Sequence, residues 1–317
     1  MKTAVIIPCY KVKKHILSVI KGIGNKVDLI VVVDDNCPEN SGKFVEENSA
    51  DSRVKVIFND ENLGVGGAVK NGYKYALKKE IDIFVKLDGD GQMSPKLICR
   101  IIKPIINGEA DYVKGNRFFD IESIQKMPAI RIFGNSMLSL INKFVNGYWN
   151  IMDPTNGFVA IHRNALKLIS LEKIENRFFF ESDMLFRLSI IKAVVVDVPM
   201  TAHYANEKSN LSISHSAFSF PFKYLNRFLK RIFYNYFLRE FNIASLELLF
   251  GNIFMIFGIL FGGYFWIKSI NTGVIATSGQ VMIASIPILL GFILLLLALH
   301  VDLISIPNKP LSKQDFE

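Results

Sequence analysis

Short apolar runs alternate with segments of helical periodicity over the first third of the chain. Each apolar run is five to seven residues long and rich in β-branched or aromatic side chains, which is typical of strands. The runs lie at 3–7, 29–33, 54–58, 81–87 and 110–114. The intervening segments at 14–23, 39–48, 66–79 and 95–107 are expected to be helices. This alternation predicts an α/β fold with a mainly parallel sheet and helices on both of its faces.

A less regular region extends the same domain to about residue 215. Helices are expected at 127–147 and 179–191, and a strand at 193–198. The stretch 153–162, DPTNGFVAIH, is expected to be a turn that leads into a strand. Residues 1–215 are therefore expected to form one catalytic domain.

A basic amphipathic helix is expected to follow, within 216–245. Between 222 and 241, apolar side chains recur at helical spacing beside a basic stripe made of Lys223, Arg227, Lys230 and Arg231. Such a helix is suited to lying on a membrane surface. The alternative is a solvated basic helix packed on the domain.

Two long apolar segments end the pattern. Residues 248–267 and 281–299 contain no charged side chain, and each is long enough to cross roughly 30 Å of hydrocarbon as a helix. They predict a transmembrane hairpin over 246–304, with a tail at 305–317. The alternative, a pair of buried core helices, is disfavoured because such helices usually carry a polar stripe. The hairpin also offers a surface for homo-oligomer formation.

The charges around the hairpin predict its orientation. Lys and Arg side chains gather before the first segment and after the second, whereas the loop between them, 268–280, holds one lysine. Positive flanks predict that both ends lie on the cytoplasmic side. The start of the chain has an apolar run too short for a signal peptide, so a cytosolic catalytic domain at the inner membrane is expected.

Composition adds two constraints. The chain of 317 residues has a formal net charge of +8 at pH 7, which suits an anionic membrane surface, and no nucleic-acid partner is expected. Its three cysteines lack the spacing of a disulfide or metal motif and are expected to be free thiols.

The stretch Lys86–Pro95, KLDGDGQMSP, carries more acidic side chains than a turn requires. Asp88 and Asp90 lie two residues apart after a predicted strand, and Gln92 adds a third oxygen ligand. Oxygen ligands of this kind suit Mg²⁺ or Mn²⁺, which are often shared with substrate phosphates. A plain surface turn would explain this stretch if it stood alone.

Other motifs accompany it in a fixed order. Pro8-Cys9-Tyr10, Asp34-Asp35-Asn36, a glycine-rich stretch at 64–67 that opens a helix, and Asp88-Gly89-Asp90 follow one another along the chain. Over roughly residues 3–210 the sequence resembles the family-2 glycosyltransferases of the GT-A fold, a Rossmann-like architecture. It looks most like those that transfer sugars to polyprenyl phosphates, such as dolichol-phosphate mannose synthase.

The resemblance implies roles for particular residues. The nucleotide-sugar donor would be bound by Pro8, Tyr10, Asp35, Gly66, Asp88, Lys208 and Ser209. The divalent ion would be held by Asp88, Asp90 and Gln92. The acceptor would meet Arg131, Asn135, Gly157 and Phe158. The transition state would be stabilised by the ion on Asp90, and Arg117 and Lys208 would add to that stabilisation.

The chain departs from the family pattern in two places. Lys11-Val12 stands where Asn-Glu usually follows the tyrosine, and Lys208-Ser209 reverses a Ser-Lys pair that an arginine usually precedes. Both differences touch donor or acceptor contacts.

The expected activity is an inverting, metal-dependent transfer of a sugar from a nucleotide to a polyprenyl phosphate. A phosphate acceptor is already ionised and needs no general base. The alternative acceptor, a hydroxyl of a lipid-linked saccharide, needs a base, and Glu181 or Asp183 is placed to provide one. These two acids can equally be ordinary charges on a helix face. A non-catalytic membrane scaffold of the same fold is a further alternative, disfavoured by the intact Asp88, Asp90 and Gln92.

Overall fold

The protein is described by a computed structural model that covers residues 1–119, 129–200 and 213–313. The chain divides into two compact units. The first contains Met1–Arg231 together with Pro307–Glu317, and the second contains Ile232–Ile306.

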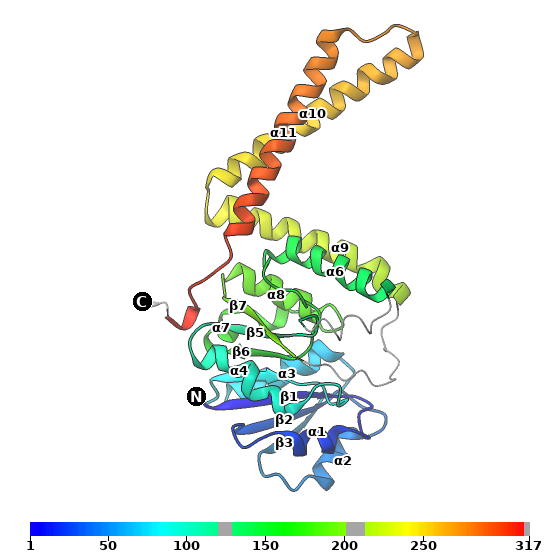
Figure 1. Ribbon diagram of the computed structural model, residues 1–317. Helices are drawn as coiled ribbons and strands as arrows, with labels where there is room; N and C mark the ends of the chain where they lie inside the picture. The colour runs from blue at the N-terminus through cyan, green and yellow to red at the C-terminus, as the bar shows by residue number, and fades with distance from the viewer. Residues whose placement is uncertain (120–128, 201–212, 314–317) are drawn as a thin grey trace. The chain divides into compact units, whose positions relative to one another are not determined.

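The first unit is built on a sheet of seven strands in the order β3-β2-β1-β4-β6-β5-β7 (Figure 1). Their bounds are β1 Thr3–Cys9, β2 Leu29–Asp34, β3 Val54–Phe58, β4 Ile83–Lys86, β5 Tyr112–Asn116, β6 Val159–His162 and β7 Val195–Pro199. All neighbouring strands are parallel except that β6 runs antiparallel to both β4 and β5. The predicted α/β fold with a mainly parallel sheet is confirmed.

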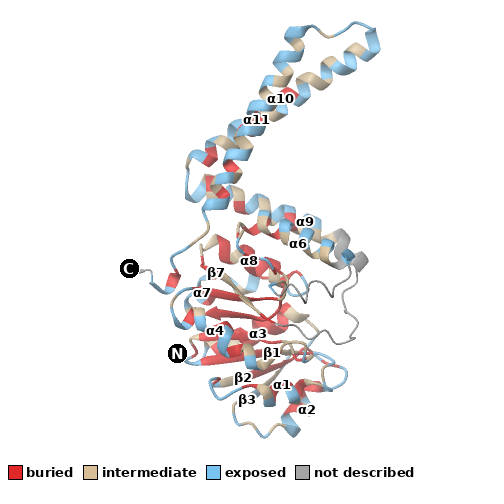
Figure 2. Cartoon of the chain, viewed as in Figure 1, coloured by how far each residue is buried: buried red, intermediate tan, exposed pale blue. Residues whose placement is uncertain are grey.

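Helices cover both faces of this sheet. Along β1, Ala4 and Ile6 pack into one core cluster, and Val5 and Ile7 pack into the other, because successive side chains of a strand point to opposite faces. The first cluster includes residues of α3 Val65–Leu77, α7 Arg163–Leu168 and α8 Phe180–Ile190. The second includes residues of α1 Ile16–Gly22, α2 Ser41–Asn48 and α4 Ile98–Ile106. Figure 2 shows the resulting run of buried residues along the strands.

Two further helices belong to the first unit and carry exposed apolar side chains. These are α6 Ala129–Asn146 and α9 Ile213–Ile232. Tyr224 of α9 packs with Val145 of α6 and with Phe179 in a small separate cluster. The helix expected at 216–245 differs from what is observed, since α9 begins earlier and gives way to a π-helical segment, Phe233–Arg239.

Two of the four side chains of the basic stripe of α9 pair with acidic groups of the same unit. Nζ of Lys223 lies 2.7 Å from Oε2 of Glu175, and Nε of Arg227 lies 2.6 Å from Oδ1 of Asp183. Leu225 and Leu229 are instead exposed, at 54 % and 56 %. The helix therefore packs Tyr224 and two paired charges against the domain and exposes Leu225 and Leu229, whereas a helix on a water-soluble surface usually keeps its apolar side chains inward.

The last described residues of the chain return to the first unit. Leu311 is buried in the core cluster that contains α7 and α8. Its backbone N–H donates to both carboxylate oxygens of Asp111, at 2.9 and 3.0 Å. Asp111 is fully buried and also accepts a hydrogen bond from the backbone N–H of Val194.

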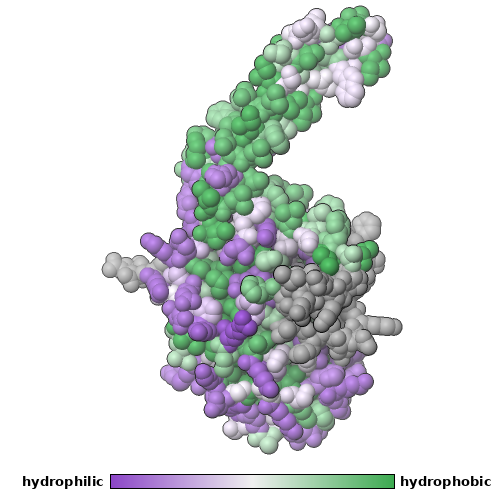
Figure 3. Space-filling model, in the orientation of Figure 1, coloured by the Kyte–Doolittle hydropathy of each residue, from purple (hydrophilic) through white to green (hydrophobic). Residues whose placement is uncertain are grey.

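The second unit is a helical hairpin of α10 Ile243–Thr272 and α11 Ser278–Ile304. Both helices are long and apolar enough to cross a membrane, and Figure 3 shows hydrophobic residues over most of their surface. Glycines allow their close approach: a Cβ on Gly258 would lie 2.7 Å from the carbonyl oxygen of Ala284, and one on Gly291 would lie 2.8 Å from that of Gly251.

Candidate active site

The loops that leave β1 and β2 lie side by side. The backbone N–H of Asp35 donates to the carbonyl of Cys9, and the N–H of Lys11 donates to the sulfur of Cys37. Tyr10 is 38 % exposed at this edge. The structure therefore brings Pro8, Tyr10 and Asp35, the expected base-pocket residues, to one end of the sheet.

Asp35 holds the loop that precedes α3. Its carboxylate accepts hydrogen bonds from the side chain of Asn59 and from the backbone N–H groups of Leu63 and Gly64, at 2.7 to 3.0 Å. Asp35 is also 97 % buried, with 3 % of its surface exposed. Asp35 therefore fixes the loop before α3, and a direct contact with the base or ribose stays a prediction.

Gly66 and its neighbours bring the start of α3 close to the segment before α8. A Cβ on Gly66 would collide with the carbonyl oxygen of Glu175 and lie 2.8 Å from the ring of Phe180. The N–H of Gly67 donates to the carbonyl of Asn176 at 2.9 Å. Gly66 thus allows a close contact between α3 and the 175–180 segment. Gly72 allows α3 to lie close to β1, because a Cβ there would collide with Ile6.

The loop after β4 carries the expected ion ligands. Asp88 is 27 % exposed, and Oδ1 of Asp90 accepts a hydrogen bond from the N–H of Gln92 at 3.0 Å. Gly91 has φ +79°, a conformation that favours glycine and lets the loop turn back. The loop stands at the carboxyl end of a central strand, where ligands of α/β sheets bind.

The residues of this loop fit a hard divalent cation. Asp88 and Asp90 supply two carboxylates, which are ligands that Mg²⁺ and Mn²⁺ prefer. Over the described residues, no group of three or more His, Cys, Asp or Glu side chains could hold a metal. An ion on this loop would therefore need further oxygens from water or from a substrate diphosphate.

A buried lysine that sequence reasoning missed links this loop to α8. Nζ of Lys86, the last residue of β4, lies 2.9 Å from Oδ1 of Asp88 and 3.3 Å from Oε1 of Glu181. It also donates to the carbonyl of Gly157 at 3.2 Å. Burial acts to lower the pKa of Lys86, but the carboxylates of Asp88 and Glu181 outweigh it and raise that pKa above its ordinary value.

The turn before β6 is packed against the same ammonium. A Cβ on Gly157 would collide with Nζ of Lys86 and lie 2.8 Å from Oδ2 of Asp88. Phe158 is 1 % exposed and belongs to the core. Of the two expected acceptor residues here, Gly157 therefore adjoins the ion loop and the Phe158 side chain packs in the core, so a contact of Phe158 with the acceptor stays a prediction.

Arg117 does not point freely into the site. Its Nε and Nη2 donate to the two oxygens of Asp153, at 2.7 and 2.9 Å, and Asp153 is fully buried. The expected contact between Arg117 and a donor phosphate stays a prediction. It requires the guanidinium to bind the phosphate and the Asp153 carboxylate at the same time.

Asp183 forms part of a structural ion-pair network. One oxygen accepts hydrogen bonds from the guanidinium of Arg187, and the other accepts from Nε of Arg227. The residue is fully buried, and the N–H of Glu175 also donates to it. A carboxylate held by two cations is a poor general base, so the structure disfavours that expected role for Asp183.

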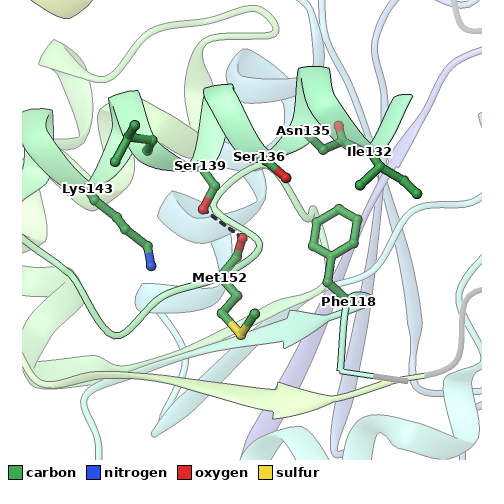
Figure 4. A pocket seen from close by; sticks show the side chains of 8 residues that line it. Phe118, Ile132, Asn135, Ser136, Ser139, Lys143 and Met152 are labelled. Carbon is green, nitrogen blue, oxygen red and sulfur yellow. Dashed lines mark hydrogen bonds between the residues drawn. The ribbon is translucent and has the colours of Figure 1, made fainter. Parts of the chain in front are cut away.

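A cavity of about 340 Å³ lies along α6. Its walls are formed by Phe118, Ile132, Asn135, Ser136, Ser139, Leu140, Lys143 and Met152 (Figure 4). The cavity therefore combines apolar walls with hydroxyl, amide and ammonium groups. Asn135 faces it as an expected acceptor residue; the side chain of Arg131 is outside the described structure, as are Lys208 and Ser209.

Two further ionisable groups lie in β5 and β7: Lys114 is fully buried and Asp197 is partly buried. Burial lowers the pKa of Lys114 in β5 to about 8, and its Nζ donates to the carbonyl of Asn156 at 2.8 Å. Burial raises the pKa of Asp197 in β7 to about 6. The signal for Lys86 and Lys114 is in the sequence: each is a lysine at the end of, or inside, an apolar strand.

Comparisons with known proteins agree with this architecture. Residues 4–169 match the model of glycosyl transferase family 2. The UDP-N-acetylglucosamine–dolichyl-phosphate N-acetylglucosaminyltransferase of Methanococcus voltae is 32 % identical over 213 residues, which cover 63 % of this chain and 84 % of that protein. The undecaprenyl-phosphate mannosyltransferase of Micrococcus luteus is 29 % identical, over 63 % of this chain and 83 % of that protein.

A solved structure shares the fold. Glucosyl-3-phosphoglycerate synthase of Mycobacterium tuberculosis, in complex with Mn²⁺, uridine diphosphate and glucosyl-3-phosphoglycerate, superposes with a TM-score of 0.51 at 16 % identity, covering 73 % of this chain and 79 % of that one. The family match spans more than half of the chain, and the sheet, its loops and the order of motifs are those of a GT-A fold. The chain belongs to glycosyl transferase family 2 and is a glycosyltransferase.

Proposed function

We propose that this enzyme transfers a sugar from a nucleotide donor to a polyprenyl phosphate at the cytoplasmic face of a membrane. A divalent ion would be held by Asp88 and Asp90, with Gln92 beside them. The two relatives named above, which act on dolichyl phosphate and undecaprenyl phosphate by name, support this acceptor class.

One observation in the structure carries the choice of a phosphate acceptor. Both candidate general bases are engaged: Glu181 lies against the ammonium of Lys86, and Asp183 is held by Arg187 and Arg227. A hydroxyl acceptor needs a base to remove its proton, whereas a lipid phosphate is ionised at neutral pH. A site whose carboxylates are occupied by cations therefore suits the phosphate.

The surface of the first unit supports a lipid acceptor. Six apolar side chains of α6 are between 37 % and 83 % exposed: Ile130, Phe133, Met137, Leu140, Ile141 and Phe144. On α9, Phe222, Leu225 and Leu229 are exposed as well. Apolar side chains gathered on two helices of one unit are typical of a membrane-facing surface. A lipid acceptor would be bound there, and the cavity along α6 would hold the part of its apolar chain next to the phosphate.

The course of the chain supports the proposed orientation of the hairpin in the membrane. The hairpin Ile232–Ile306 is preceded and followed by segments of the catalytic unit, so both of its ends belong on one side of the membrane. The positive flanks favour the cytoplasmic side for that unit.

In the proposed reaction, a phosphate oxygen of the acceptor attacks the anomeric carbon of the sugar. The bond from that carbon to the nucleoside diphosphate breaks, and the configuration at the carbon inverts. The ion would offset the negative charge that develops on the leaving diphosphate. Tyr10 and Pro8 would hold the base of the donor, and Asn135 would meet the acceptor. Arg131, Lys208 and Ser209 keep the roles implied by the family pattern.

The test is transfer to a defined lipid. Membranes containing the full chain are incubated with radiolabelled UDP-N-acetylglucosamine, UDP-glucose or GDP-mannose, each with undecaprenyl or dolichyl phosphate and Mn²⁺. A labelled lipid that is sensitive to mild acid is expected from one donor, and none is expected from the Asp90→Asn variant or in EDTA. Label found only on a lipid-linked saccharide would instead support the hydroxyl acceptor.

A further inference from the structure

The buried ammonium of Lys86 has no role in the proposed reaction. It is 1 % exposed, and its three partners come from three segments: the ion loop, α8 and the turn before β6. Because solvent is excluded, its charge acts on these partners with little screening.

We propose that Lys86 is a positioning residue that serves as the resident counter-ion of Asp88 and makes divalent-ion binding depend on the diphosphate of the donor. This inference rests on the proposed function, in which Asp88 and Asp90 hold the ion.

The argument starts from the charges around the loop. An ion bound to Asp88 would lie close to an ammonium that is 2.9 Å from the same carboxylate. Like charges repel, and burial of Lys86 weakens the screening of that repulsion. The loop offers only two carboxylates of its own, so an ion that arrives alone gains little to offset this cost.

A nucleoside diphosphate changes this balance. Its phosphate oxygens supply both negative charge and ligands to the ion, which offsets the repulsion from Lys86. The ion and the nucleotide should therefore bind cooperatively, and each should raise the affinity of the other by the same factor. Lys86 keeps the loop preformed in the meantime, because its ammonium holds Asp88 and Glu181 together despite their like charges.

Lys114 provides a matched control. It is a second fully buried lysine in the same sheet, and its Nζ donates to the carbonyl of Asn156. In the part of the chain that the structure describes, it forms no ion pair with Asp88. Replacing either lysine by methionine removes one buried charge at similar side-chain volume.

The experiment measures ion binding rather than transfer. Mn²⁺ is titrated into the full chain in detergent, with and without UDP and, separately, GDP, and free Mn²⁺ is followed by electron paramagnetic resonance. For Lys86→Met we expect the Kd for Mn²⁺ without nucleotide to be at least about tenfold lower than for the wild type. The increase in Mn²⁺ affinity that the nucleotide causes should be smaller by a corresponding factor. Lys114→Met should stay within about twofold of the wild type. If folded Lys86→Met has the same Kd for Mn²⁺ as the wild type, or a higher one, the inference is overturned.

Glu181→Gln keeps the test decisive if Lys86→Met does not fold. With Glu181 neutral, the whole ammonium charge falls on Asp88, so nucleotide-free Mn²⁺ binding should weaken several-fold, and an unchanged Kd contradicts the inference. If the wild type binds no Mn²⁺ with either nucleotide, the ion site of the proposed function fails too. If it does bind Mn²⁺ with nucleotide and the variants match it, only the role of Lys86 fails.

Discussion

Arg117 and Asp153 form a two-point ion pair in which Nε and Nη2 of the arginine donate to the two oxygens of a carboxylate with no exposed surface. The N–H of Arg117 donates to the same carboxylate at 3.2 Å. This pair fastens the end of β5 to the turn at 153–157, which also contains Gly157. An arginine expected to serve the donor is therefore also part of the framework of the site.

Removing that arginine should destabilise the catalytic unit. Arg117→Met leaves the Asp153 carboxylate buried without its cation, which should lower the free energy of unfolding by about 3 kcal/mol. Thermal unfolding in detergent measures the change. Lys2→Met, which breaks the exposed pair with Glu80, is the control and should leave Tm unaltered. Equal Tm values for Arg117→Met and the wild type would show that Asp153 has other sufficient partners.

The ion loop should be essential for transfer. Asp90→Asn removes one of two carboxylate ligands, and the loss of ion stabilisation should reduce kcat/KM by about 100-fold or more. Steady-state transfer in Mn²⁺ measures it, and unfolding in the absence of ions checks that the variant is folded. Activity within tenfold of the wild type would argue against an ion on this loop.

Glu181 should not determine the pH dependence of transfer. Because its carboxylate pairs with Lys86, Glu181→Gln should lower the rate without changing the shape of the pH profile of kcat/KM. The profile is measured between pH 5.5 and 9 with polyprenyl phosphate as acceptor. Loss of the acidic limb of the profile in the variant would identify Glu181 as a general base and favour a hydroxyl acceptor.

Lys114 should contribute a pH-dependent penalty to stability. Burial lowers its pKa to about 8, whereas the unfolded chain has an ordinary lysine near 10.5, so the unfolded state binds more protons between these values. Stability therefore rises with pH across this window, by at most about 1.4 kcal/mol per pH unit. The stability of Lys114→Met should change less between pH 8 and pH 10 than that of the wild type, as thermal unfolding measures it. Parallel curves would mean that Lys114 titrates normally in the folded protein.

The docked tail should stabilise the catalytic unit. Leu311 is 3 % exposed, so Leu311→Ala should cost about 2–4 kcal/mol in the free energy of unfolding. Leu168→Ala, at a position that is 48 % exposed in the same unit, is the matched control and should cost far less. Proteolysis of the tail offers a second readout, since undocking exposes 307–313. Equal stability of the two variants would mean that the tail is not held in solution.

The pattern of apolar runs is enough to predict most of the fold. Alternating strands and helices, the two uncharged segments and the order of the strand-end motifs are local properties of the chain, since side-chain periodicity follows directly from strand and helix geometry. They predicted the α/β sheet, the two long apolar helices and the family. The loop 88–92 was placed correctly at a strand end for the same reason.

The charge partners could not be predicted in this way. Lys86 and Glu181 are 95 residues apart, and Arg227 meets Asp183 across 44 residues. Whether a carboxylate is free to act as a base depends on which cations the fold brings within hydrogen-bond distance of it. The antiparallel direction of β6, the outward-facing apolar side of α9 and the docking of Leu311 on Asp111 likewise depend on packing between distant segments. Periodicity specifies which face of an element is apolar, and only tertiary packing decides what that face, or a charge beside it, meets.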